Sequence, residues 1–124
     1  MRRIRYVYYN RNPHNISEED CVCRAISTAM DMDYYYVANL LALNGESQSC
    51  DMLTKSCYRR VLERKFGLKS NYGNGKTVNE IARMYPNNRV IMRVYAHLTC
   101  SLYGKVYDTF DCTDEMVDEY WIVC

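Results

Sequence analysis

The sequence predicts an α+β protein in which most helices precede most strands. Apolar residues at helical spacing fill the first two thirds of the chain, whereas alternating segments rich in β-branched and aromatic residues dominate the last third. This order favours a mostly antiparallel sheet covered by the N-terminal helices. With 124 residues, the chain has room for a single domain, 1–124, with one modest core.

The N-terminal part predicts a strand, a loop and a first helix. Residues 4–9 alternate in character and include aromatic and β-branched types, which favours a short strand. Residues 10–15 are rich in Asn and contain a Pro, which is typical of a loop. Asp20 is a favourable N-cap for a helix that begins at Cys21 and ends near Asp31. The inward stripe of this helix is formed by Val22, Ile26, Ala29 and Met30.

Two further helices are expected in the middle of the chain. Asp33 can cap a helix over 34–43, and the pair Asn44-Gly45 is a suitable C-terminal stop. A longer helix is expected over 51–66, because apolar residues recur there at helical spacing and Gly67 follows.

A glycine- and asparagine-rich segment, 69–76, predicts an exposed loop. Thr77 and Glu80 then form a capping-box pattern that opens a short helix over 78–84, which Pro86 ends. The remaining strands are joined by short turns, one of them at Gly104. They are expected over 89–95, 97–103, 106–108 and 119–123.

The net charge and the number of cysteines argue against several classes of protein. The net charge of +1 leaves no electrostatic footprint for nucleic acid or an anionic membrane. No apolar run is long enough to span a bilayer, and the basic N-terminus lacks the apolar core of a signal peptide. Seven cysteines, an odd number, argue against a secreted disulfide framework and favour reduced thiols in the cytoplasm. The cysteine spacings do not match common zinc sites, so neither a metal nor an organic cofactor is expected.

Cys21 is the candidate nucleophile. Its place in the first turn of a helix puts the thiol where free N–H groups and the helix dipole favour negative charge. A thiol in that place ionises more easily than a free one. A buried structural cysteine is the alternative interpretation of the same position.

His97 and Asp108 are the candidate partners of this thiol. They lie on two consecutive predicted strands joined by the Gly104 turn, so one hairpin can hold an imidazole beside a carboxylate. A thiol needs a base to take its proton, and the base needs a partner to fix its tautomer and orientation. A histidine satisfied at the edge of the core is the alternative for His97.

Four short motifs resemble those of small papain-like proteins of bacteriophages and bacteria. They are DCVCRA at 20–25, HLT at 97–99, GKVYDTFD at 104–111 and YW at 120–121. Members of that family typically read DCVVRA, GHLT, DGVIYDTWD and YW. The sequence departs from this pattern at Cys23, Ala96 and Phe110.

The resemblance implies a papain-like fold and a triad of Cys21, His97 and Asp108. Asp111 is the alternative third member, because the motif contains both aspartates. The resemblance also implies an amide side chain upstream of the cysteine in the oxyanion hole, for which Asn15 has the matching spacing.

The expected function is that of a papain-like cysteine hydrolase, either a peptidase or amidase or an acyl-transferase, with a thioester intermediate and a peptide or amide substrate. Such a protein is expected to be phage-encoded and to act in the host cytoplasm. The alternative is a catalytically silent protein of the same fold that holds a host protein or a small signalling molecule. The role of Arg24, an ion-pair, surface or functional residue, stays open.

Overall fold

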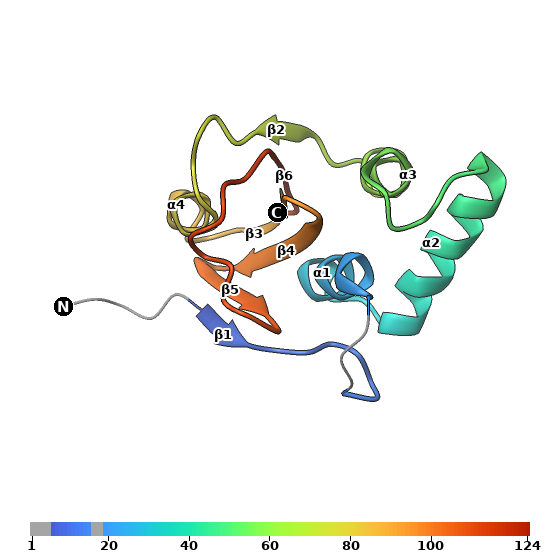
Figure 1. Ribbon diagram of the computed structural model, residues 1–124, viewed down its shortest axis with the longest axis horizontal. Coiled ribbons are helices and arrows are strands. Elements are labelled where there is room, and N and C mark those ends of the chain that lie inside the picture. The colour runs from blue at the N-terminus through green and yellow to red at the C-terminus, as the bar shows by residue number, and fades with distance from the viewer. Residues whose placement is uncertain (1–5, 16–18) are drawn as a thin grey trace.

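A computed structural model describes residues 6–15 and 19–124, and a six-stranded sheet lies at the centre of this part of the chain. The strand order is β1-β5-β4-β3-β6-β2 (Figure 1). Strands β1 and β5 run parallel, and the other four neighbouring pairs run antiparallel. The expectation of an α+β protein with a mostly antiparallel sheet is therefore confirmed. The strands are β1 (Tyr6–Tyr8), β2 (Ser70–Tyr72), β3 (Arg89–Val94), β4 (His97–Leu102), β5 (Lys105–Asp108) and β6 (Glu119–Ile122).

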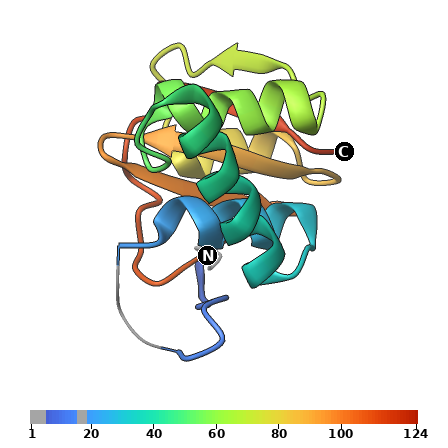
Figure 2. The same ribbon diagram turned by 90° about the vertical axis from the view of Figure 1, so that its right-hand side faces the viewer.

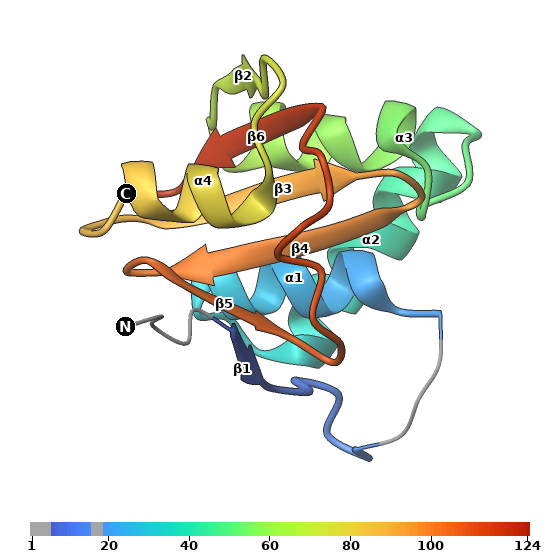
Figure 3. The same ribbon diagram turned by 60° about the vertical axis from the view of Figure 1, so that its left-hand side comes forward.

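Helices cover both faces of this sheet. Helices α1, α2 and α3 lie on one side and α4 lies on the other (Figures 1 and 3). Figure 2 looks onto the first side, where α2 lies in front of α1. The helices are α1 (Cys21–Met30), α2 (Tyr34–Gln48), α3 (Lys55–Arg60) with a π-helical continuation η1 (Val61–Lys65), and α4 (Val78–Met84).

Alternation along the central strands divides the buried side chains between two cores. Ile91 and Trp121 pack with α1, α2 and α3, whereas Val90, Met92 and Tyr120 pack with α4. Successive strand residues point to opposite faces of a sheet, so a strand covered on both sides is apolar at consecutive positions. The sheet is therefore buried on both faces, which holds its central strands rigidly.

The second helix extends beyond its predicted end. It continues through Asn44 and Gly45 to Gln48 and ends at Ser49, which adopts a left-handed conformation with φ of 53°. A Cβ atom at Gly45 would lie 3.0 Å from the carbonyl oxygen of Cys50. This glycine therefore permits a close approach of the following segment and does not end the helix.

The third helix starts later than the sequence predicts and changes its winding. Asp51 first forms a turn, in which its carboxylate accepts a hydrogen bond from the Leu53 N–H at 3.0 Å. Such side-chain turns compete with helix formation, so α3 begins only at Lys55. At its end, the Phe66 N–H binds the Val61 carbonyl at 3.1 Å, five residues back, which is the π-helical pattern.

The segment 69–76 is not entirely a loop. Residues 70–72 form β2, which pairs with β6 and occupies one edge of the sheet. The sequence of β2 is largely polar and gives no strand pattern. Residues 70–72 therefore form a strand because they pair with the edge of β6. The capping box that follows is confirmed: the side chains and backbone N–H groups of Thr77 and Glu80 bind one another in both directions.

Two of the seven cysteines are paired. Cys50 and Cys57 form a disulfide that joins the segment after α2 to α3. The prediction of reduced thiols is wrong for these two, because the turn at Asp51 folds the chain back and brings them together. Cys23, Cys100 and Cys112 are buried free thiols, as expected of small apolar side chains. In the described ranges, no helix combines the length and the apolar character that crossing a membrane requires.

Candidate active site

Cys21 is the first residue of α1, as the sequence predicts. Its thiol is partly exposed, whereas Val22 and Cys23 behind it are buried. The expectation that Asp20 caps the helix with its carboxylate is wrong, because that side chain makes no hydrogen bond to the first turn. The carboxylate instead forms a buried ion pair with Arg24, one turn along α1.

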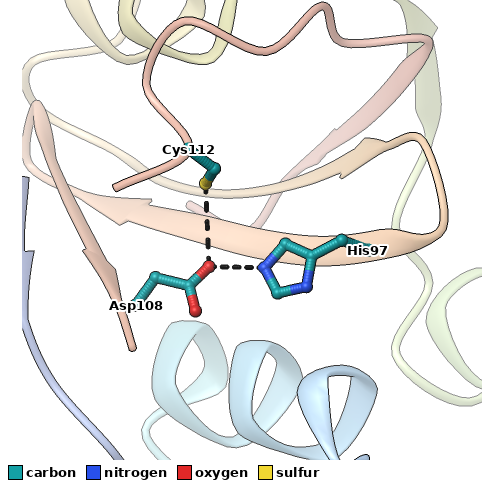
Figure 4. Close-up of side chains that lie close together, drawn as sticks. All are labelled: His97, Asp108 and Cys112. Carbon is teal, nitrogen blue, oxygen red and sulfur yellow. Dashed lines mark hydrogen bonds and ion pairs between the residues drawn. The ribbon is translucent and has the colours of Figure 1, made fainter. Parts of the chain in front are cut away.

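His97 and Asp108 meet across neighbouring strands. His97 begins β4 and Asp108 ends β5, and His97 Nε2 lies 2.6 Å from Asp108 Oδ2 (Figure 4). The Thr109 N–H donates to the other carboxylate oxygen, Oδ1, at 2.7 Å. Because the carboxylate only accepts, Nε2 is the protonated nitrogen, and the ring orientation is fixed. The structure therefore brings together the histidine and aspartate singled out in the sequence.

Cys21 and His97 line the same cleft, and His97 favours the thiolate form of Cys21. Since Nε2 binds Asp108, Nδ1 is the ring nitrogen that remains for the thiol. Burial opposes ionisation of Cys21, but the hydrogen bonds with His97 and with the Leu98 backbone outweigh it. The pKa of Cys21 is consequently lowered from its ordinary value.

The pKa values of His97 and Asp108 are shifted in opposite directions. Burial would lower the pKa of His97, but hydrogen bonds with Asp108, Cys112 and Cys21 raise it to about 11. Burial would raise the pKa of Asp108, but the hydrogen bond and positive charge of His97 hold it below its ordinary value. These shifts favour a charged imidazolium between a carboxylate and a thiolate at neutral pH.

A cleft of about 860 Å³ opens onto Cys21 and His97. Leu53, Ala96 and Phe110 contribute apolar parts of its wall. The Phe110 ring lies 4.7 Å from the His97 ring, centroid to centroid, and partly covers it. A second hollow of about 330 Å³ shares Cys21 and His97, and Lys55 and Tyr58 help to line it. The thiol therefore lies between two open spaces.

Asn15, the predicted oxyanion residue, lines the larger cleft together with Cys21. It is exposed and adopts a left-handed conformation with φ of 52°. Residues 16–18, which connect it to the helix start, lie outside the described ranges. Asp111, the alternative third member, is exposed, and its carboxylate accepts hydrogen bonds from the backbone and the hydroxyl of Thr113. Asp108, and not Asp111, contacts His97.

Cys112 is a member of the site that the sequence analysis did not single out. Its buried thiol lies 3.7 Å from Asp108 Oδ2 (Figure 4). One nitrogen of His97, one oxygen of Asp108 and this sulfur lie within 4.8 Å of one another, a spacing that could hold a metal ion. A metal there would displace the proton between His97 and Asp108. No local pattern around residue 112 signals this contact, because only the chain path after β5 creates it.

Comparison of the chain with protein-family models, with curated proteins and with solved structures found no match.

Proposed function

We propose that this chain is a papain-like cysteine hydrolase, either a peptidase or amidase or an acyl-transferase, that uses Cys21, His97 and Asp108 as a triad. One observation carries the proposal: His97 binds Asp108 through Nε2 at 2.6 Å and lines the same cleft as Cys21, whose ionisation it favours. A nucleophile needs a base to take its proton, and the base needs a group that orients it. Cys21, His97 and Asp108 would fill these three roles in that order. The packing of the cysteine-bearing helix against the strand that begins with His97 supports a papain-like arrangement.

The reaction would proceed through a thioester. The Cys21 thiolate attacks a carbonyl carbon and forms a C–S bond, and the carbonyl π electrons move to the oxygen. On collapse, the C–N bond breaks and the leaving amine takes the proton from His97 Nδ1. Water or an amine then attacks the thioester, gives its proton to His97 and releases Cys21 as the thiolate.

The developing negative charge on the carbonyl oxygen needs donors that are already in place. The backbone N–H of Cys21 begins α1 and has no partner within the helix, so it is one donor. The Asn15 side-chain amide is the proposed second donor, since Asn15 lines the same cleft. Reorientation of that side chain on substrate binding would complete the oxyanion hole.

The cleft suits a peptide or amide chain. Tyr8 and Phe110 stand on its wall and are about half exposed or more, 62% and 50%. Exposed aromatic rings with polar neighbours are typical of surfaces that bind extended polypeptides. The small size of the domain favours short substrates or chain ends over long peptides.

Alkylation of Cys21 tests the proposed ion pair without a known substrate. The rate of iodoacetamide modification is measured from pH 4 to pH 9, peptide by peptide, with glutathione as an ordinary thiol in the same reaction. We expect Cys21 to react at pH 6 at least ~10-fold faster than glutathione, and we expect His97→Ala to abolish this excess. Cys21 that titrates like glutathione would overturn the proposed thiolate–imidazolium pair.

Acyl transfer is tested with p-nitrophenyl acetate. Release of p-nitrophenolate should be accompanied by transient acetylation of Cys21, followed by its hydrolysis, and Cys21→Ser should show neither. If Cys21 alkylates as expected but never becomes acetylated, the hydrolase proposal fails. The silent binding protein would then be the better description, and capture of host proteins or small signalling molecules would replace activity assays.

A further inference from the structure

A buried polar cluster lies directly behind the proposed triad. Asp20 Oδ2 accepts hydrogen bonds from the Tyr34 hydroxyl at 2.7 Å and from the Asn12 side-chain amide at 3.0 Å. Its other oxygen, Oδ1, pairs with Arg24 Nη1. The Asp20 and Arg24 side chains are only 9% and 11% exposed. A buried ion pair adds little to stability compared with apolar packing. The Asp20–Arg24 pair is therefore better explained by a role in the neighbouring site than by a role in stability.

The second arm of the Arg24 guanidinium points toward the triad. Nη2 lies 3.9 Å from Asp108 Oδ1 and 3.5 Å from the Thr109 hydroxyl. Asp108 thus meets His97 through Oδ2 and faces Arg24 through Oδ1. One arginine therefore spans two buried carboxylates, one on the cysteine helix and one on the strand that carries the triad acid.

We propose that Arg24 is a positioning residue of the Cys21–His97–Asp108 site, and that Asp20 anchors it. This inference rests on the proposed function, since it assigns Arg24 to the same triad. Arg24 ties the start of α1, which carries Cys21, to the end of β5, which carries Asp108. A planar guanidinium with two donor edges can make this link, whereas a single ammonium group cannot reach both carboxylates with the same geometry.

The charges then alternate along a continuous path. Asp20 is negative, Arg24 positive, Asp108 negative, His97 positive and Cys21 negative. Each charge has opposite neighbours, which offsets the cost of burial along the whole row. Arg24 also lies close enough to favour the Cys21 thiolate directly. Loss of its charge would leave both carboxylates without this positive partner and would remove a cation that favours the thiolate.

Other titratable groups face this row from neighbouring elements. The hydroxyl of Tyr34, in α2, binds Asp20, and the thiol of Cys112 binds Asp108. The hydroxyl of Tyr6, in β1, donates to the Asp108 backbone carbonyl at 3.1 Å. None of these three groups carries a positive charge. Lys55, Tyr58 and Arg93 line the second hollow with Cys21, whereas Arg24 Nη2 lies 3.9 Å from Asp108.

The test is the pH profile of Cys21 alkylation in intact protein carrying Arg24→Gln or Arg24→Lys. We expect Arg24→Gln to move the midpoint upward by about one pH unit, which lowers the rate by up to about tenfold at pH values below both midpoints. Arg24→Lys keeps a charge but loses the second contact, so its midpoint should lie between those of the wild type and Arg24→Gln. The same samples are followed by thermal unfolding, so that stability and reactivity are separated.

Arg59→Gln is the matched control. Arg59 also pairs with a buried carboxylate, that of Glu119, at 3.1 Å, but it does not line the cleft. Its loss should lower the melting temperature and leave the Cys21 midpoint unchanged. If Arg24→Gln behaves in the same way, Arg24 is a structural residue and the inference is wrong.

Arg24→Gln could fail to fold because it leaves Asp20 charged and unpaired. The double variant Asp20→Asn/Arg24→Gln removes both charges of that pair and should show the same upward shift as Arg24→Gln. A wild-type midpoint in the folded double variant would overturn the inference. The wild-type profile itself reports on the proposed function: if wild-type Cys21 lacks His97-dependent reactivity at pH 6, the triad fails, whereas an unchanged midpoint in the Arg24 variants refutes only the role of Arg24.

Discussion

At the scale of single residues, the environment of Asp108 explains why it is the proposed acid of the triad. It is 5% exposed and its two oxygens face His97, Arg24 and the Thr109 N–H. Asp111, three residues later, stands in solvent and organises a local turn with Thr113. A carboxylate in a dry, hydrogen-bonded place orients an imidazole far more strongly than one in water.

This difference predicts opposite behaviour of two conservative variants. Asp108→Asn removes the charge opposite His97 and should lower Cys21 alkylation at pH 6 by about tenfold to a hundredfold. Asp111→Asn should leave that rate within about twofold of the wild type, because its contacts lie in an exposed turn. Peptide-resolved alkylation of both variants checks this, and a larger loss in Asp111→Asn would make Asp111 the third member.

At the scale of elements, the turn of the β3–β4 hairpin holds an alanine in a left-handed conformation. Val94 pairs with His97, so Tyr95 and Ala96 form the turn, and Ala96 has φ of 54°. Two-residue hairpin turns demand a left-handed residue, and glycine occupies that conformation without the clash a Cβ causes. A glycine would fit this backbone without strain, and this chain carries an alanine in a strained conformation directly before His97.

Relief of this strain gives an element-scale prediction. Ala96→Gly should stabilise the protein by about 1 kcal/mol, because the avoided Cβ clash outweighs the greater freedom of glycine in the unfolded chain. Urea unfolding of the variant checks the gain. Since the turn geometry is kept, the pH profile of Cys21 alkylation should coincide with that of the wild type. A loss of stability would show that the left-handed alanine is not strained.

At the scale of the whole molecule, the site joins the two halves of the chain. Cys21 lies on an N-terminal helix, whereas His97 and Asp108 lie on strands of the C-terminal sheet. Burial of the sheet on both faces holds these groups without help from the loops. Their charges are therefore coupled to global folding, and the pKa shifts make stability depend on pH.

The sign of this dependence follows from the direction of each shift. The pKa of His97 is raised from 6.5 to about 11, so its contribution is fully present below pH 6.5 and is lost as the pH rises toward 11. The pKa of Asp108 is lowered, so its contribution is present above its ordinary pKa and is lost as the pH falls. In a Cys21→Ser background, which removes the thiolate, the free energy of unfolding should decline from pH 6 to pH 9, by up to about 1.4 kcal/mol per pH unit.

Urea unfolding at pH 6 and pH 9 measures this decline. The added change His97→Ala should remove it, whereas His14→Ala serves as the matched control, because His14 is exposed and its Nε2 binds the Tyr35 hydroxyl. Equal slopes in the Cys21→Ser protein with and without His97 would contradict the raised pKa. An increase in stability toward pH 9 would contradict the sign.

Local sequence determined most of the elements and the identity of the reactive groups. The capping box at Thr77, the alternation in β3 and the apolar stripe of α1 are properties of neighbouring residues, so they could be predicted. Cys21 at a helix start and His97 one hairpin away from Asp108 are likewise determined by short spacings. By contrast, β2 exists only through pairing with β6. The continuation of α2 past Gly45 was also not predicted, because this glycine allows the close approach of Cys50 and does not end the helix.

Only the tertiary structure decided how the charges in the site are paired. The spacing of Asp20 and Arg24 allows an ion pair on one helix, but the approach of Arg24 to Asp108 joins residues 84 positions apart. Cys112 and Asp108, and the disulfide partners Cys50 and Cys57, are only four and seven positions apart. Even so, the irregular path of the chain, and not a helix or strand period, brings each pair together. The physical reason is that period and capping act over a few residues, whereas burial and electrostatic pairing depend on which segments the folded chain brings into contact.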